Sequence, residues 1–371
     1  MRLIEHVSDA IRREGFYTAF FKIFRRMNTA LKYLQLDLIK QFRRWKSIKG
    51  RYQGKRVFII GNGPSLNETE LYLLKDEYTM CFNRFFLFEE RLNWTPNFFM
   101  ATDGLVLEDL EKEFSEIIPK TDISIFPGIH FHGKNYSGSL DEFSNTFWTI
   151  PLIGRRFSKL LPFIYPGHSV IYDSFQVLKH LGFAEIILLG VDFNYKIHET
   201  AKVISTNNIG IESQADDDPN HFDPRYFGKN RRYHQPKDFI IQNMVNDMEY
   251  LAKKVTNESF NIINAGVKSK LTFFSKKPLN DLINYSEEEK EEIFCELFNK
   301  VIKQQGQNSI KISDVIFIEE YSGTNNCEKI FSMPLKNGLK MISILIFKYI
   351  PLGPFKNKYY FIRRKREISN A

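Results

Sequence analysis

The sequence predicts an α/β fold in which a mostly parallel sheet is covered by helices on both faces. Short apolar runs that suit buried strands alternate along the chain with segments that suit helices, and this alternation is typical of parallel sheets. A turn rich in glycine follows the first of these runs directly. Hydrophobic residues make up 43% of the 371-residue chain, which is enough to form a sizeable core.

The expected elements follow one another in a regular order. Residues 1–50 suit two amphipathic helices that are separated near 27–30. Apolar runs predict strands at 57–60, 79–83, 97–102, 123–126, 186–189 and 261–264. Helical patterns predict helices at 68–75, 108–118, 169–181, 239–255 and 287–303. The segments 127–168 and 194–237 are expected to be irregular, and a loop as long as the second usually has a function.

The chain is expected to have three regions. They are a basic helical extension over residues 1–54, a catalytic domain over 55–282 and a C-terminal appendage over 283–371, which is expected to be a helical extension with a basic amphipathic end. Basic charge is concentrated at the ends, because residues 1–56 carry a net +11 and residues 336–371 a net +8 in a chain of +8. The catalytic body between them is therefore acidic.

The basic ends also carry apolar residues. Leucine and isoleucine alternate with lysine and arginine over residues 31–46, and residues 339–347 are apolar apart from Lys340 and Ser343. Such runs are too short to span a bilayer, and they suit a helix on a membrane surface or a partner better than a nucleic-acid groove. A packed helix with a solvated basic face is the alternative. We expect an anionic membrane surface as a partner and no nucleic acid, and an oligomer is left open.

The cysteines and the first residues indicate the compartment. Cys81, Cys295 and Cys327 lie far apart and match neither a zinc spacing nor a disulfide framework, which fits a reducing compartment. Met1 is followed by mixed charged residues rather than an apolar run, so no signal peptide is expected. We therefore expect a cytoplasmic protein that lies peripherally on the inner face of the cell membrane.

The glycine-rich turn follows the apolar run Val57–Ile60 and reads Gly61-Asn62-Gly63-Pro64-Ser65. Glycine can adopt dihedrals closed to other residues and lets a ligand approach the backbone closely. Exposed N–H groups at the end of a strand can bind phosphate. The spacing matches neither a Walker loop nor the usual dinucleotide fingerprint. An ordinary strand-to-helix turn, with Ser65 capping the helix, is therefore the alternative.

Polar residues recur where the predicted strands end. Ligands of open parallel sheets bind beyond the carboxyl ends of the strands. The residues at these ends are Asn62, Ser65, Asn83, Asp103, Asp192, Asn194 and Asn264. Each of them alone is a common turn or capping residue, but their recurrence predicts a site that reads a base and a ribose.

Several motifs resemble known enzymes. Gly61–Leu66, Cys81–Phe85 and Thr95–Phe99 resemble, in order and spacing, the first third of the bacterial family 42 sialyltransferases. Leu181–Phe193 resembles a later helix–strand unit of that family. Asp217–Lys229 is more similar to a related group, which contains the motility-accessory-factor proteins and an archaeal 6-hydroxymethylpterin diphosphokinase-like domain.

The resemblance covers about residues 55–280 and implies a Rossmann-like fold that binds a CMP-linked sugar. It also implies a histidine general base beyond the strand that leads to Asp192. His234, just before the helix predicted at 239–255, lies closest to the family's base, and His221 is the alternative. A histidine suits this role because its pKa lies near the working pH.

The candidate site residues fall into three further groups. The expected nucleotide-binding residues are Gly61, Asn62, Gly63, Ser65, Asn83, Asn97, Asp103, Ser169, Asp192 and Asn194. The resemblance also implies tyrosines that hold the leaving phosphate, for which the candidates are Tyr195, Tyr226 and Tyr233. The position after Phe193 departs from the sialyltransferases, because Asn194 stands where that family has a tyrosine. Arg225 and Lys229 are candidates to contact the acceptor or the sugar, and a solvated basic loop is the alternative.

We expect a glycosyltransferase of bacterial surface-glycan synthesis that uses a CMP-linked donor and a glycan or lipid-linked acceptor. No cofactor and no metal site are expected for this activity. One alternative is an ATP-dependent pyrophosphokinase that needs Mg²⁺, and another is a non-catalytic nucleotide-binding scaffold. Asp216, Asp217 and Asp218 have the carboxylates that Mg²⁺ prefers, although adjacent aspartates in a loop are usually solvated.

Overall fold

The computed structural model describes most of the chain between residues 38 and 293, and three strands beyond it. The described residues are 38–87, 95–128, 139–152, 154, 156–204, 210–234, 237–255, 260–286, 288–289, 292–293, 315–321, 349–355 and 358–365. The chain divides into two compact units that interleave along the sequence. The first unit comprises Met1–Lys55, Asn97–Ala184 and Asn246–Phe260, and the second comprises Arg56–Pro96, Glu185–Val245 and Asn261–Ala371. The predicted boundaries at residues 54 and 282 stay a prediction.

Five parallel strands form the main sheet of the second unit. In spatial order they are β12 (Ser275–Lys276), β11 (Asn261–Asn264), β7 (Glu185–Leu189), β1 (Arg56–Ile60) and β2 (Thr79–Phe82). Alternate side chains of a strand point to the same face, and one face gathers Phe58, Ile60, Cys81, Ile187, Leu189 and Ile263 into a buried cluster. The short helices η1 (Pro64–Glu68) and η2 (Leu71–Leu74) pack on this cluster.

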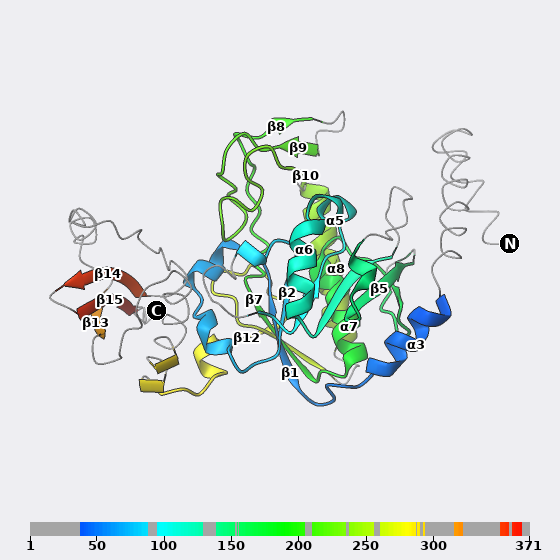
Figure 1. Ribbon diagram of the computed structural model, residues 1–371, viewed down its shortest axis with the longest axis horizontal. Coiled ribbons are helices and arrows are strands. Elements are labelled where there is room, and N and C mark those ends of the chain that lie inside the picture. Colours follow the sequence, from blue (N-terminus) through cyan, green and yellow to red (C-terminus); the bar gives the residue numbers. More distant parts are fainter. Residues whose placement is uncertain are drawn as a thin grey trace. The chain divides into compact units, whose positions relative to one another are not determined.

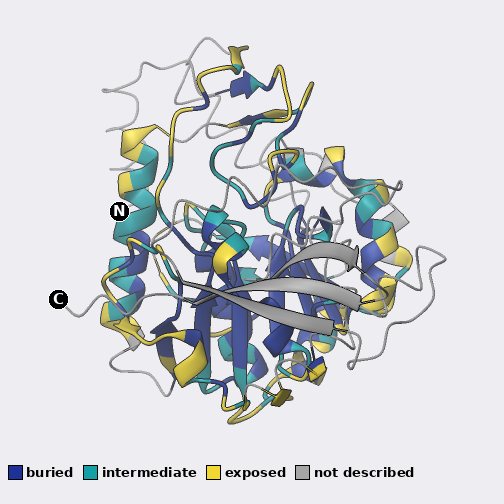
Figure 2. Cartoon of the chain, turned by 90° about the vertical axis from the view of Figure 1, so that its left-hand side faces the viewer, coloured by how far each residue is buried: buried dark blue, intermediate teal, exposed yellow. Residues whose placement is uncertain are grey.

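Four more parallel strands form the sheet of the first unit. Their order is β3 (Phe98–Met100), β4 (Ile123–Pro127), β5 (Thr146–Pro151) and β6 (Phe163–Ile164). The strands described in the two units thus confirm the predicted mostly parallel α/β sheet (Figure 1). Their residues are largely buried, as the dark blue strands of Figure 2 show.

Helices cover both faces of the sheet in the first unit. On one face, Phe114 of α6 (Glu111–Ile117) packs against Phe126, with ring centroids 5.5 Å apart. Phe126 packs in turn against Trp148, with ring centroids 5.9 Å apart. On the other face, Trp45 of α3 (Leu38–Ile48) packs against Phe147, with ring centroids 5.1 Å apart. Because Phe147 and Trp148 are successive residues of β5, their side chains point to opposite faces. The predicted two-sided cover is confirmed for this unit.

Two long helices lie close to their predicted bounds. Ser169 accepts a hydrogen bond from the amide of Ile171 and caps the start of α7 (Val170–Leu181). Gly182 ends this helix in the left-handed conformation, with φ of 94°. The helix predicted at 239–255 is α8 (Asp238–Val255).

Other predicted elements are wrong in detail. The helix predicted at 68–75 is replaced by η1 and η2, because Leu71–Leu74 are all buried and leave no exposed face for an amphipathic helix. The helix predicted at 108–118 is two short helices, α5 (Gly104–Asp109) and α6. The remaining short helices are η3 (Ile118–Lys120), η4 (Ser139–Glu142) and η5 (Leu279–Asp281).

Both segments that were expected to be irregular contain strands. The segment 127–168 holds β5 and β6. The segment 194–237 holds β8 (Lys202–Val203), β9 (Gly210–Glu212) and β10 (Arg232–His234), which pair as a small antiparallel sheet (Figure 1). Strands of two or three residues are too short to show an alternating pattern, so the polar composition of the segment concealed them.

The ends of the chain are described only in part. Of the predicted N-terminal helices, α3 is described, and residues 1–37 lie outside the described residues. Most of the predicted helix at 287–303 and all of the apolar run 339–347 also lie outside them. Where a helical extension was expected, the described residues form β13 (Val315–Tyr321), β14 (Tyr349–Phe355) and β15 (Lys358–Lys365). Among the described residues, no helix has the length and apolar character needed to cross a membrane.

Candidate active site

The glycine turn lies at the carboxyl end of β1 and packs against the turn that follows β7. Gly61 N donates to Leu189 O at 2.8 Å, and Gly63 N donates to Gly190 O at 2.9 Å. A Cβ atom on Gly63 would lie 2.7 Å from Gly190 O, closer than real Cβ atoms come. Packing between the two turns therefore requires glycine here, and both amides are bonded within the protein. Contact of this turn with a nucleotide stays a prediction.

Asp192 fastens the two turns together. Its buried carboxylate accepts hydrogen bonds from Ser65 N, at 2.9 Å, and from Ser65 Oγ. Its own carbonyl accepts a hydrogen bond from Lys270 N at 2.9 Å. The next residue, Phe193, has a φ of 51°, which is unusual for a bulky side chain. Asp192 and Ser65 were both predicted as site residues, and the structure brings them together as parts of the turn.

Two asparagines at adjacent strand ends contain buried polar atoms without a partner. Asn62 Nδ2 donates to Phe82 O at 3.1 Å and to Tyr226 Oη at 3.0 Å. The other side-chain atom, Asn62 Oδ1, and the matching Asn83 Oδ1 are buried and accept no hydrogen bond from the described residues. Asn83 also adopts a left-handed conformation, with φ of 50°. Unused buried acceptors are uncommon in proteins, so these two atoms mark the carboxyl ends of β1 and β2 as a place for a donor group.

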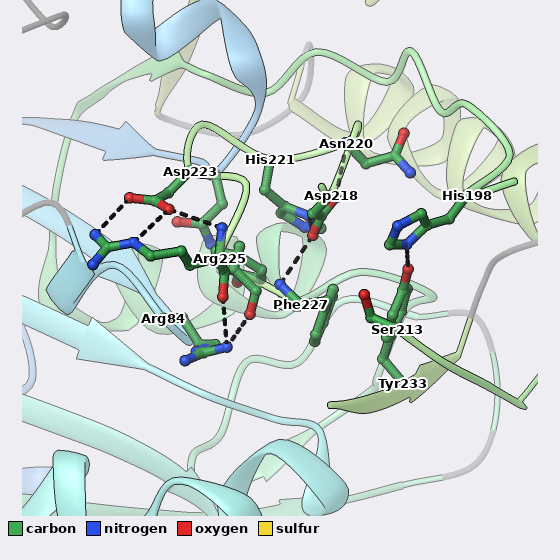
Figure 3. Close-up of polar contacts among 12 residues, drawn as sticks. Arg84, His198, Ser213, Asp218, Asn220, His221, Asp223, Arg225, Phe227 and Tyr233 are labelled. Atoms are coloured by element: carbon green, nitrogen blue, oxygen red, sulfur yellow. Dashed lines mark hydrogen bonds and ion pairs between the residues drawn. The ribbon is translucent and has the colours of Figure 1, made fainter. Parts of the chain in front are cut away.

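A buried aspartate organises the loop between β9 and β10. Asp218 accepts hydrogen bonds from His221 Nδ1 at 2.8 Å, Asn220 N at 2.8 Å and Phe227 N at 3.1 Å (Figure 3). Burial would raise the pKa of Asp218, but the hydrogen bonds and the charge of His221 outweigh it and lower that pKa. Asp218 is therefore ionised at neutral pH.

His221 is held in the orientation of a general base. Its ring stacks on Tyr226 with centroids 3.8 Å apart and 2° between the planes, and it meets Phe227 edge on at 5.2 Å. An ionised carboxylate only accepts hydrogen bonds, so Asp218 requires the hydrogen on His221 Nδ1. The lone pair of a neutral ring then lies on Nε2, and 20% of the side chain is exposed. An oriented histidine with a free Nε2 can take a proton from a substrate.

His234, the first candidate from the sequence, lies at the end of β10 and is exposed. Its backbone pairs with Gly210. The side chain makes no hydrogen bond to another described residue, and the next two residues, 235 and 236, are not described. Among the described residues, His221 thus has partners that orient its ring and His234 has none. Catalytic contacts often form only with substrate bound, so the assignment of His234 stays a prediction.

A second histidine, which lies between β7 and β8, was not predicted. His198 is buried, with its Nε2 2.8 Å from Asp217 Oδ1 and its Nδ1 bonded to Tyr233 Oη. Thr200 Oγ1 donates to Asp217 Oδ2 at 2.6 Å. The ring of Tyr233 stacks on Phe227 at 4.0 Å. No motif surrounds His198 in the sequence, so no sequence signal could have singled it out.

The three candidate phosphate-binding tyrosines differ in their surroundings. Tyr226 is buried and its hydroxyl bonds Asn62, while the hydroxyl of Tyr233 bonds His198. Burial raises the pKa of both phenols, so both keep their hydrogen at neutral pH. Burial, with a contribution from the charge of Asp192, raises the pKa of Tyr195 to about 12. Their contact with a phosphate stays a prediction, and so does the contact of exposed Asn194 with a nucleotide.

The candidate cations and the three adjacent aspartates bond within the loop. Arg225 makes a bidentate ion pair with buried Asp223, with Nε 3.0 Å and Nη2 2.9 Å from its oxygens. Exposed Lys229 donates its amide to Asp216 at 2.9 Å. The carboxylates of Asp216, Asp217 and Asp218 therefore brace the loop. In the part of the chain that the structure describes, no cluster of three histidine, cysteine or acidic residues could hold a metal ion.

A buried arginine that was not predicted fixes this loop to the sheet. Arg84 follows β2 and donates to Arg225 O at 3.1 Å and to Tyr226 O (Figure 3). Phe222 N donates to Asn62 O at 2.9 Å. The loop that carries His221 is thus bonded to the carboxyl ends of both β1 and β2. Arg84 stands within the motif Cys81–Phe85, which was the available signal for it.

The other three predicted nucleotide-binding residues belong to the first unit. Asn97 precedes β3, at the amino end of that strand, and donates to Asp122 Oδ2 at 3.1 Å. Asp103 follows the carboxyl end of β3 and is exposed, and Ser169 caps α7. The structure does not test their contact with a nucleotide.

The first unit also contains a polar cluster that was not predicted. Asp247 Oδ2 accepts hydrogen bonds from His168 N at 2.9 Å and from His168 Nδ1 at 2.8 Å. Nearby, Asp173 accepts a hydrogen bond from Gly167 N at 2.8 Å. Burial raises the pKa of Asp173 to about 8, so this carboxyl is largely protonated at neutral pH. These contacts order the segment that leads into α7.

Comparison with known proteins agrees with the motifs. Residues 33–198 match the family model described as 6-hydroxymethylpterin diphosphokinase MptE-like. The predicted resemblance to this superfamily is confirmed. No curated protein matches the chain.

Two solved structures are similar to the chain. One is the MAf glycosyltransferase from Magnetospirillum magneticum AMB-1, with 14% identity and a TM-score of 0.39 over 69% of this chain and 38% of that one. The other is the sialyltransferase CstII from Campylobacter jejuni in complex with cytidine-5'-monophosphate, a substrate analogue. It has 18% identity and a TM-score of 0.33 over 61% of this chain and 86% of that one. The chain thus matches less than half the length of the MAf protein.

Proposed function

We propose that the protein is a glycosyltransferase that moves a sugar from a nucleotide-activated donor to an acceptor hydroxyl, with His221 as the general base. The observation that carries this proposal is the pair formed by His221 and Asp218. The pair is fastened to the carboxyl end of β1 through the bond from Phe222 N to Asn62 O. Ligands of parallel sheets bind at that edge, so the base lies where a donor is expected.

The proposed step is a single displacement. Nε2 of His221 takes the proton of the acceptor hydroxyl while the acceptor oxygen forms a bond to the anomeric carbon. The bond between that carbon and the donor phosphate breaks, and the nucleotide leaves with the electron pair. Asp218 stabilises the imidazolium that forms, as a buried carboxylate does in a catalytic triad. No cofactor takes part in this step.

The donor that we propose is CMP-linked, with a sugar of the nonulosonic type, and the acceptor is a glycan or a lipid-linked glycan. The motifs at Gly61–Leu66 and Cys81–Phe85 support this choice through their resemblance to sialyltransferases. The buried acceptors Asn62 Oδ1 and Asn83 Oδ1 support it as well, because nucleoside hydroxyl and amino groups are donors that could satisfy them.

Calorimetry with CMP, UDP, GDP and ATP, each with and without Mg²⁺, tests the proposal. We expect CMP to bind without Mg²⁺. A transfer assay with the donor that binds then compares the native chain with His221→Ala. Binding of CMP followed by transfer supports the proposal. Binding of CMP without transfer would leave the nucleotide-binding scaffold as the better description, and failure of every nucleotide to bind would contradict the proposal.

A second candidate function is an Mg²⁺-dependent pyrophosphokinase. The match of residues 33–198 to a diphosphokinase-like family favours it. Such an enzyme must bind ATP through a metal ion on its phosphates. ATP binding that appears only with Mg²⁺, together with no binding of CMP, would favour the kinase over the transferase.

A further inference from the structure

His198 joins two segments that each carry a candidate base. Asp217, its partner at Nε2, is the neighbour in sequence of Asp218, which orients His221. Tyr233, its partner at Nδ1, is the neighbour of His234. The His198 side chain is only 3% exposed, whereas that of Asp217 is 36% exposed, so the bond to Tyr233 is buried and the bond to Asp217 is partly buried.

The chemistry of the partners fixes the direction of each bond. Hydrogen bonds from Thr200 and His198 lower the pKa of Asp217, so its carboxylate is ionised at neutral pH and can only accept. His198 Nε2 therefore carries a ring hydrogen, and in a neutral ring the lone pair then lies on Nδ1. The phenol of Tyr233 then donates its hydrogen to Nδ1. In this arrangement Tyr233 has no hydrogen left to donate to a leaving phosphate.

We propose that His198 is a positioning residue that sets the two candidate bases by bonding Asp217 with one ring nitrogen and Tyr233 with the other. The consequence for turnover rests on the proposed function, whereas the ring geometry does not. His198 and His221 are then opposite tautomers. His198 carries its hydrogen on Nε2, and His221 carries it on Nδ1.

Two substitutions separate the two bonds of His198. In His198→Gln the amide nitrogen reaches the place of Nε2 and keeps the bond to Asp217, but nothing replaces Nδ1. In His198→Asn the amide oxygen takes the place of Nδ1 and keeps the bond from Tyr233, but the chain is too short to reach Asp217. Tyr233→Phe is the matched control, because it removes the same bond as His198→Gln while the imidazole stays in place.

If His221 is the base, we expect His198→Asn to lower kcat by about 10- to 100-fold, the scale of a small misplacement of a catalytic group. His198→Gln should then lower kcat only slightly, and Tyr233→Phe should lower it by at least as much as His198→Gln, because it also removes the hydroxyl. If His198→Gln and Tyr233→Phe instead lower kcat more than His198→Asn does, His198 acts through β10 and His234. Equal, native-like kcat in all three variants would overturn the proposal.

Nitrogen-15 NMR of the histidine rings provides a readout that needs no activity. We expect the predicted opposite tautomers in the native chain, and faster solvent exchange of the His221 Nδ1 hydrogen in His198→Asn than in His198→Gln. An Nδ1–H tautomer of His198, or equal exchange in both variants, would overturn the proposal. If the native chain transfers no sugar, the proposed function fails, and the NMR result still decides the role of His198.

Discussion

The two candidate bases differ in how their rings are held. Asp218 and Tyr226 fix both the tautomer and the plane of His221, whereas His234 is exposed at the end of β10. Orientation matters because a general base must meet its proton along a hydrogen bond of ordinary length. This difference favours His221, although His234 lies closer to the position of the family's base in the sequence.

His221→Ala should lower turnover by about 10²- to 10⁴-fold, the usual contribution of a general base, with little change in nucleotide affinity. His234→Ala is the matched control and should lower turnover by a smaller factor. Steady-state transfer assays with both variants check this expectation. If His234→Ala is the inactive variant and His221→Ala is not, the assignment is reversed.

Asp173 should make the stability of the protein fall as the pH rises. Its folded-state pKa is about 8, whereas an unfolded aspartate has a pKa of about 3.9. Between about pH 4 and pH 8 the folded chain therefore holds a proton that the unfolded chain has released, so the free energy of unfolding decreases with pH in that window. The decrease amounts to roughly 1.4 kcal/mol for each pH unit at most.

Asp173→Asn removes this ionisation and keeps an oxygen for the amide of Gly167. Urea unfolding at pH 5 and pH 8 should show the variant stabilised at pH 8, with a smaller effect at pH 5. Asp109→Asn, at an exposed position on α5, serves as the control and should leave the free energy of unfolding unchanged at both pH values. Equal effects of Asp173→Asn at the two pH values would contradict the proposed ionisation.

At the scale of the element, the turn after β1 and the turn after β7 act as one packed unit. Two backbone bonds and the carboxylate of Asp192 join them. Gly63 has an ordinary φ of −67°, so the need for glycine there is steric rather than conformational. A ligand at this edge therefore depends on the packing of the two turns.

Gly63→Ala should lower the free energy of unfolding by about 1–3 kcal/mol, the usual cost of overpacking. The new Cβ would meet the carboxylate of Asp192 and the carbonyl of Gly190. Gly266→Ala is a milder control, because its Cβ would come no closer than 3.0 Å to a neighbour. Native-like stability of Gly63→Ala in urea unfolding would mean that the turns separate easily, and the packing argument would fail.

The strands that the sequence predicted well are those with continuous apolar runs, such as 57–60 and 186–189. Such runs indicate burial on both faces of a parallel sheet. Strands β8 and β10 could not be predicted in this way, because they are short and lie in a polar segment. In addition, β10 pairs with β9 across the long segment that carries His221, so local pattern says little about it.

The residues of the site likewise divide into those that a local sequence pattern predicts and those that it does not. Asn62, Ser65 and Asp192 were predicted from their places at strand ends, and the structure joins two of these residues directly. The partners of His198 and Arg84 lie up to 142 residues away. Contacts of that kind depend on how the chain folds, and a single sequence contains no signal for them.

At the scale of the whole molecule, charge is the property that local structure does not explain. The basic residues gather in the two terminal regions, while the body between them is acidic. In α3, Gln41, Trp45 and Ile48 are buried, and the opposite face exposes Ile39 together with the cations Lys40, Arg43 and Lys46. An exposed face that combines apolar and basic side chains suits an anionic membrane surface.

We therefore expect the full chain to sediment with vesicles that contain phosphatidylserine, less so as salt rises, and hardly at all with neutral vesicles. Each basic residue near such a surface contributes about 1 kcal/mol, screened over about 8–10 Å. Replacing Lys40, Arg43 and Lys46 by glutamate should then weaken vesicle binding by about 100-fold or more. The control variant replaces exposed Lys276 and Lys277, which lie outside the basic ends, and should bind as the native chain does. If the native chain ignores anionic vesicles, the exposed face of α3 binds a protein partner or only solvent, and the membrane proposal fails.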